Sequence, residues 1–191
     1  MTYLVCKIER WYVYEAKGSK TLADKVRNLI NQEVPIDNTW GYDHGTWSVL
    51  HRMYPKADIP LIQLSVDKEA SMEEHYEIGK QLNNLRKEGV LIFGSGNVTH
   101  NLRMVSWQMN GGFDWAEEFD GYIIDSIIKG NYDNVVDYKK IGKSAQYAVP
   151  ISDHYAPLLY VLGSLDGGEK VKVFNDECIM GSLSMTSFLF D

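Results

Sequence analysis

Segments with helical spacing alternate with short apolar runs along this chain. The run at 90–93, VLIF, directly follows a segment with helical spacing at 71–89, where Ser71 and Glu74 form a predicted capping box. Strand–helix alternation of this kind predicts the α/β class, as a layered fold with a largely parallel central sheet and helices on both faces, as in phosphorylase/hydrolase-like folds. Strands are predicted at 58–67, 90–93, 169–174 and 184–190, and helices at 19–32, 44–54, 71–89, 113–130, 131–142 and 153–165.

The length and charge of the chain limit what it can be. Its 191 residues suffice for one sizeable core, so we expect a single domain over 1–191. A net charge of −7 argues against a nucleic-acid partner, because phosphate backbones are bound mainly by basic side chains. No apolar run is long enough to span a membrane. The two cysteines, Cys6 and Cys178, form no C-x-x-C motif, so we expect a reduced, cytoplasmic protein.

The stretch GSGNVTHN, which follows the predicted strand 90–93, is where a site is expected. Gly94 and Gly96 predict a sharp turn, and His100 comes just after it. In parallel α/β sheets, ligands bind outside the carboxyl ends of the strands. GSGNVT lacks the third glycine of a dinucleotide-binding fingerprint, and no G-x-S-x-G hydrolase motif is present, so neither of those enzyme classes is favoured.

The five histidines form no H-x-H or H-E-x-x-H motif, so any metal site must gather ligands from separate elements. His100 suits a site beyond a strand, but a hydrogen-bonded loop histidine would look the same. His154 opens a predicted helix, where a capping role is the alternative. His44, in GYDHGTW, suits a pocket wall or a tight turn. His51 and His75 lie inside predicted helices and are interpreted as structural or solvent-facing.

Four longer stretches give a family resemblance. They are WGYDHGTWSVLHRMYPKADIPLIQLSVD, GVLIFGSGNVTHNLR, SDHYAPLLYVLGS and IMGSLSMTSF. Together, and in this order, they resemble the DOPA 4,5-extradiol-dioxygenase-like proteins, which belong to the class III extradiol ring-cleavage dioxygenases. The resemblance runs from about Glu15 to the C-terminus, whereas residues 1–14 do not match the family.

The resemblance implies an oxidoreductase that opens a catecholic, DOPA-like ring with O2 at a histidine-bound non-haem metal, Fe(II) or zinc. Such chemistry needs neutral imidazole ligands, and it needs open coordination positions for the small aromatic diol and for O2. Carried over from the family, His154 is a metal ligand, and His100 is both metal-associated and the acid/base. His44 would contact the diol, with Asp43 and Asn97 orienting the histidine rings.

The sequence also departs from the family. It lacks the two N-terminal motifs, His-Gly-Ser-Pro and Ser-Ala-His-Trp, that each bring a metal-ligand histidine. We therefore expect a sheet without its first strands, whose open edge favours association into a homo-oligomer. The alternative function is a truncated, catalytically inactive family member that at most binds metal weakly. A third hypothesis is a zinc-dependent hydrolase on the same scaffold.

Overall fold

The computed structural model describes residues 14–191, which fold as two compact units. The first unit comprises residues up to Lys25 together with 35–64, and the second comprises 26–34 and 65–191. Helix α1 (Lys20–Leu29) contributes residues to both units. Residues 1–13, which hold most of the segment predicted not to match the family, lie outside the described residues.

The first unit is organised around helix α2 (His44–Met53). Asp43 caps this helix, because its side chain accepts a hydrogen bond from the backbone N–H of Thr46 at 2.8 Å. The Tyr42 hydroxyl reaches the carbonyl oxygens of Ala16 and Leu61, at 3.3 and 3.1 Å, and so ties three parts of the unit together.

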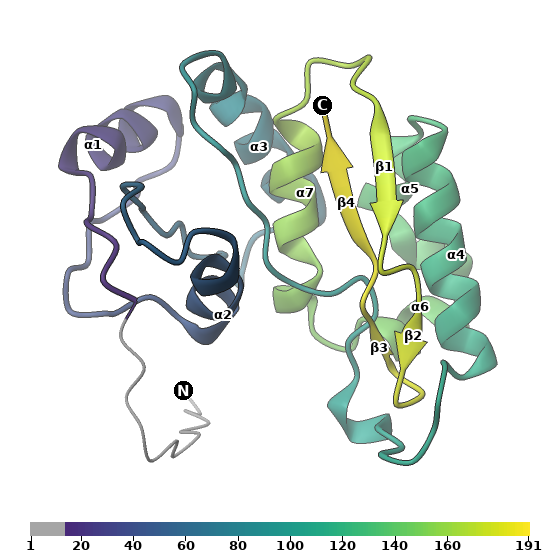
Figure 1. Cartoon of the computed structure of the whole chain (residues 1–191). Coiled ribbons are helices and arrows are strands. Elements are labelled where there is room, and N and C mark those ends of the chain that lie inside the picture. The colour runs from purple at the N-terminus through teal and green to yellow at the C-terminus, as the bar shows by residue number, and fades with distance from the viewer. Residues whose placement is uncertain (1–13) are drawn as a thin grey trace. The chain divides into compact units, whose positions relative to one another are not determined.

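The second unit is mainly helical, and a large part of its core comes from helix α4 (Asp114–Ile128), drawn at the right of Figure 1. Phe119, Ile123 and Ile127 of α4 are fully buried and form one side of the hydrophobic core. The same core takes in residues of α5 (Tyr132–Val136), α6 (Lys143–Ala148), α7 (Ala156–Gly163) and the 3₁₀ turn Tyr138–Ile141. Two further 3₁₀ turns are Leu102–Met104 and Ser152–His154.

Helix α3 (Met72–Lys87) packs closely along α7. The predicted capping box at its start is confirmed: Ser71 accepts from the Glu74 N–H, and Glu74 accepts from the Ser71 N–H. Gly79 and Gly163 stand where the two helices meet, and a Cβ on Gly163 would lie 2.2 Å from the carbonyl oxygen of Tyr76. The helices can approach this closely only because neither residue has a side chain.

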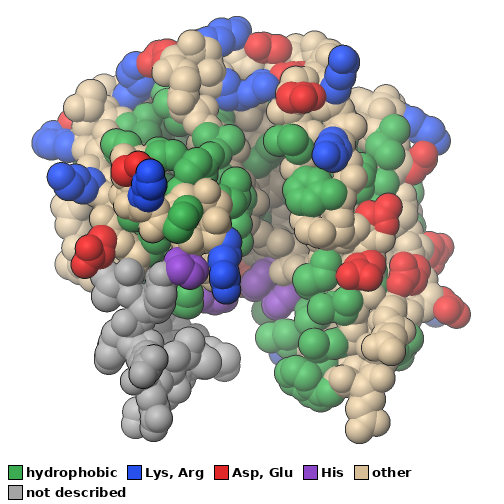
Figure 2. Space-filling model, viewed as in Figure 1, with side chains coloured by type: hydrophobic (Ala, Val, Ile, Leu, Met, Phe, Trp, Pro, Cys, Tyr) green, Lys and Arg blue, Asp and Glu red, His purple; other side chains and the backbone are tan. Residues whose placement is uncertain are grey.

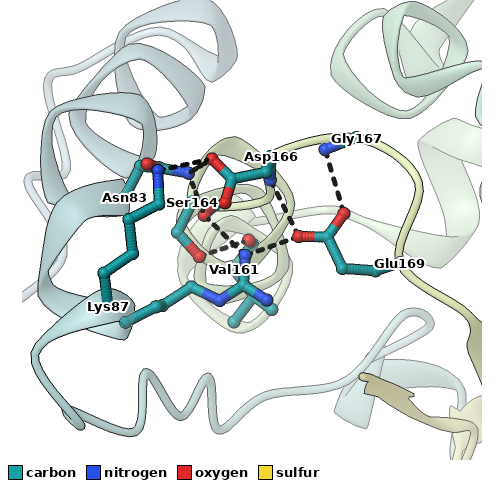
Figure 3. A network of polar contacts seen from close by, with 8 residues as sticks. Asn83, Lys87, Val161, Ser164, Asp166, Gly167 and Glu169 are labelled. Carbon is teal, nitrogen blue, oxygen red and sulfur yellow. Dashed lines mark hydrogen bonds and ion pairs between the residues drawn. The ribbon is translucent and has the colours of Figure 1, made fainter.

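A polar network joins the C-terminal ends of these two helices (Figure 3). The Asn83 amide and the Arg86 guanidinium both donate to the Ser164 carbonyl, at 2.8 and 3.1 Å. They thereby satisfy a carbonyl that the end of α7 leaves without a helical partner. Arg86 also pairs with Glu169 at 2.5 Å, and this pairing fixes the turn that leads from α7 into the first strand.

The strands of the second unit form two small antiparallel sheets, seen in yellow in Figure 1. β1 (Val171–Phe174) pairs with β4 (Ser187–Phe190), with Val171 opposite Phe190. β2 (Cys178–Ile179) pairs with β3 (Leu183–Ser184). The strands predicted at 169–174 and 184–190 are therefore confirmed in most of their length.

The largely parallel central sheet is not found within residues 14–191, and this prediction is corrected. Residues 58–67 and 90–93 are extended but carry no strand ladder; Leu61 forms only an isolated parallel bridge to Gly18. The physical reason is that an apolar run becomes a strand only when a second chain segment supplies a ladder of hydrogen bonds, and no described segment forms a ladder with either run. The described residues form an α/β fold with seven α-helices and two small sheets.

Across the described residues, no helix combines the length and the apolar character that crossing a bilayer requires.

Candidate functional site

His100 and His154, two histidines far apart in the sequence, stack on each other in the second unit. Their ring centroids lie 3.6 Å apart and the ring planes are inclined by only 13°. Both side chains are partly exposed. Figure 2 shows histidine side chains at the molecular surface, on a face where acidic and basic side chains are interspersed. The two histidines named by the family resemblance are thus brought together where a small ligand can reach them.

Backbone hydrogen bonds fix the positions of both histidines. The N–H of His100 donates to the Ala148 carbonyl at 2.9 Å, and His100 forms an antiparallel bridge with Leu183. The N–H of Asn97 donates to the carbonyl of His154, also at 2.9 Å. The segment that carries His100 is therefore bonded directly to the turn that carries His154.

Gly94 and Gly96 allow this close approach. A Cβ on Gly96 would lie 2.1 Å from the His154 carbonyl oxygen, and one on Gly94 would lie 2.7 Å from that of Pro157. Neither glycine has a positive φ, and the chain bends just beyond them, at Val98 and Thr99. The glycines are needed because the extended chain passes within hydrogen-bonding distance of a second backbone segment, where a side chain would not fit.

Replacing Gly96 by alanine is expected to lower the free energy of unfolding by about 2 kcal/mol, because the new methyl group forces two backbone segments apart. Urea denaturation followed by circular dichroism measures the change. Gly41→Ala is the matched control, since a Cβ there meets no atom within 4 Å. Equal stability of the two variants would contradict the close contact.

The surroundings of His100 favour its neutral form. Burial lowers the pKa of His100, the positive charge that His154 can carry lowers it further, and Asp153 acts in the opposite direction. Two rings stacked this closely cannot both be protonated without strong repulsion. A neutral imidazole has a free lone pair, and that is the form that binds a metal ion or accepts a proton.

The ring nitrogens of His100 and His154 are donors of a kind that metal ions accept. Two adjacent imidazoles suit zinc or iron, which both accept nitrogen ligands. Within residues 14–191 no group of three or more histidine, cysteine or acidic side chains is arranged to hold a metal. The pair therefore fits part of a coordination sphere, and it leaves positions for ligands from outside this set of residues.

The remaining predicted site residues have other visible roles. Asp43 caps α2 as described, and His44 is the first residue of that helix, in the first unit. The contact of His44 with a diol stays a prediction. The Asn97 side chain donates to the Ser184 carbonyl at 2.7 Å. The Asn97 side chain therefore ties the segment before His100 to the backbone of β3.

Sequence reasoning missed Asp120. This residue of α4 is only 3% exposed, and it accepts hydrogen bonds from the hydroxyls of Ser184 and Thr186. A signal was present in the sequence, because Asp120 occupies a helical position in line with the apolar residues Ala116 and Ile123. A carboxylate within an apolar stripe indicates that a polar partner is buried beside it. The sequence pattern does not show which segment supplies that partner.

Comparison with known families gives a match over almost the whole chain. The family described as the catalytic LigB subunit of aromatic ring-opening dioxygenase matches residues 6–187.

Curated relatives are similar over much of their length. A protein of Escherichia coli (strain K12) named "4,5-DOPA dioxygenase extradiol" is 39% identical over 91% of this chain and 66% of its own length. Proteins of the same name from Mirabilis jalapa and Beta vulgaris are 36% and 33% identical, over 85% and 94% of this chain. The chain spans 62% and 68% of those two relatives, so about a third of each relative has no counterpart here.

A solved structure shares the fold. The crystal structure of an uncharacterized protein from Escherichia coli K12 superposes with a TM-score of 0.85 at 38% identity. The match covers 94% of this chain and 75% of that one.

Proposed function

This chain belongs to the LigB family of aromatic ring-opening dioxygenases, and from this premise we propose that it acts as an extradiol dioxygenase on a catecholic substrate. The substrate would be a 1,2-dihydroxybenzene of the DOPA type, the compound that appears in the names of the relatives. The second substrate is O2. Redox chemistry of this kind requires a non-haem metal ion, and Fe(II) is the first candidate because zinc cannot change its oxidation state.

The stacked pair of His100 and His154 is the observation that carries the proposal. Two neighbouring imidazoles, both partly exposed and on segments joined by backbone hydrogen bonds, place two nitrogen donors side by side. To hold one ion together the rings would turn out of the stack, because the lone pair of a ring nitrogen lies in the ring plane. In this proposal His154 and, while its basic nitrogen carries no proton, His100 would hold the ion, which would leave room for the diol and for O2. The bound metal supplies Lewis acidity toward the diol and electrons toward O2.

His100 also serves as the proton acceptor. A catechol hydroxyl must lose its proton before its oxygen becomes a good metal ligand. The neutral ring has a single basic nitrogen, so His100 accepts this proton only while that nitrogen is free of the metal, and it then returns the proton to the opened product. The depressed pKa of His100 keeps the ring neutral near pH 7, and only the neutral ring can accept a proton.

The test begins with the metal-free chain. It is incubated anaerobically with Fe(II) and desalted, its metal content is measured, and O2 uptake is then recorded with catechol. We expect bound iron close to one ion per chain, and O2 uptake that depends on catechol. Resorcinol is the matched control substrate, because its hydroxyls are not adjacent and cannot both bind one ion.

Three results would count against the proposal. Iron well below one ion per folded chain would favour the inactive family member. Full iron loading without catechol-dependent O2 uptake would contradict dioxygenase activity directly. Stoichiometric zinc binding without any O2 consumption in the iron-loaded form would favour the hydrolase hypothesis.

A further inference from the structure

A buried carboxylate lies beneath the segment that carries His100. Asp120 of α4 is 3% exposed, and both of its oxygens are engaged. The Ser184 hydroxyl donates to one oxygen at 2.6 Å, and the Thr186 hydroxyl donates to the other at 2.5 Å. Two hydroxyl donors on one carboxylate suit its ionised form, which accepts but does not donate hydrogen bonds.

Ser184 links this carboxylate to the histidine segment. Its backbone N–H donates to the Thr99 carbonyl at 2.9 Å, and its carbonyl accepts from the Asn97 side chain at 2.7 Å. Ser184 is thus hydrogen-bonded to Asn97 and Thr99, the residues on either side of Val98. This segment directly precedes His100 in the sequence. Asn97 in turn donates to the His154 carbonyl. One set of hydrogen bonds therefore runs from Asp120 through Ser184 to both histidine-bearing segments.

Asp120 is shielded from solvent, and its burial changes its pKa. Burial raises the pKa of Asp120, and the hydrogen bonds from Ser184 and Thr186 oppose that rise. Burial, together with the charges of Asp120 and Glu117, raises the pKa of the Cys178 thiol to about 12. The thiol stays protonated at neutral pH and is a poor nucleophile. Asp120 is thus the acidic group here whose hydrogen bond with Ser184 leads to the histidine-bearing segments.

We propose that Asp120 is a positioning residue for the histidine pair, acting through Ser184 on the segment 97–100. The carboxylate fixes the side chain of Ser184, Ser184 fixes the backbone around Val98, and this backbone sets the position of the His100 ring beside His154. The proposal deepens the proposed function, because it concerns the same pair, and it rests on that function where metal binding is measured. Residues that hold metal ligands in place typically change metal affinity by about 10–100-fold when they are removed.

The test compares three variants of the full chain. Ser184→Ala removes the hydroxyl that contacts Asp120, and Asp120→Asn keeps the side-chain shape but replaces one acceptor oxygen by an amide. Ser164→Ala is the matched control: Ser164 is also 1% exposed and its hydroxyl is also hydrogen-bonded, but it contacts Val161 at the end of α7. Two readouts are taken: the histidine side-chain NMR signals of the metal-free chain, and the affinity and absorption spectrum with Co(II).

In the metal-free chain we expect Ser184→Ala and Asp120→Asn to shift the His100 and His154 ring signals, because stacked rings shield each other in a manner that depends on their separation. With Co(II), both variants should bind about tenfold more weakly, with an altered visible spectrum. Ser164→Ala should match the wild type in both readouts.

Unchanged ring signals in Ser184→Ala and Asp120→Asn would overturn the proposal. So would equal changes in Ser164→Ala, since these would show a general response to a lost buried hydroxyl. The two readouts also separate this proposal from the proposed function. A wild-type chain that binds no Co(II) would contradict the proposed metal site, while the NMR comparison still decides whether Asp120 positions the pair.

Discussion

A chain in which alanine replaces His154 is expected to lose more than 100-fold in Fe(II) or Co(II) affinity, and to lose catechol-dependent O2 uptake with it. Removing a ligand costs more than removing a residue that merely supports a ligand, and the latter loss alone is about 10–100-fold. His100→Ala should have the same effect, because the two stacked rings act as one donor pair.

Titration with Co(II) in competition with a chelator measures this effect. His51→Gln is the matched control, because it also removes an imidazole but lies on α2, in the first unit. This variant should retain the affinity of the wild type. Wild-type affinity in both His100→Ala and His154→Ala would exclude the stacked pair as the metal site, whatever the activity of the chain.

Alanine at Gly163 is expected to lower the free energy of unfolding by about 3 kcal/mol, at the upper end of the cost of overpacking. Its methyl group would lie 2.2 Å from the Tyr76 carbonyl oxygen and 3.0 Å from the Gly79 Cα. Both are backbone atoms of α3, which cannot turn aside as a flexible side chain can. The two helices would have to separate, and their buried contacts along α3 and α7 would loosen.

Urea denaturation is again the measurement, and Gly121→Ala is the control. Gly121 lies within α4, and a Cβ there meets no atom within 4 Å. Alanine at that position should raise stability by about 0.5–1 kcal/mol, because it reduces the freedom of the unfolded chain. The contact between α3 and α7 would be refuted if Gly163→Ala were as stable as the wild type.

Helices were the best-predicted part of the fold. The segment 71–89 became α3 (Met72–Lys87), with its capping box in place, and 113–130 became α4 (Asp114–Ile128). These helices could be found because their signals are local: a cap, a stop and an apolar face lie within a few turns of one another. Helix α6 (Lys143–Ala148) was not predicted, since six residues are too few to show a clear period.

Strands and site residues depended on distant partners. The apolar runs at 58–67 and 90–93 resemble strands, yet neither joins a strand ladder within the described residues. The hydroxyl partners of Asp120 lie more than sixty residues along the chain, at Ser184 and Thr186. No spacing rule connects positions so far apart.

By itself, the sequence determined the main helices and, through its family resemblance, the identity of His100 and His154 as the residues to examine. Only the tertiary structure decided that the two rings stack at 3.6 Å, that Gly96 lies in close backbone contact with His154, and that Ser184 and Thr186 donate hydrogen bonds to Asp120. The physical reason is the range of the interactions. Helix signals act between residues a few positions apart, whereas stacking, close packing and buried hydrogen bonds join segments that meet only after the chain has folded.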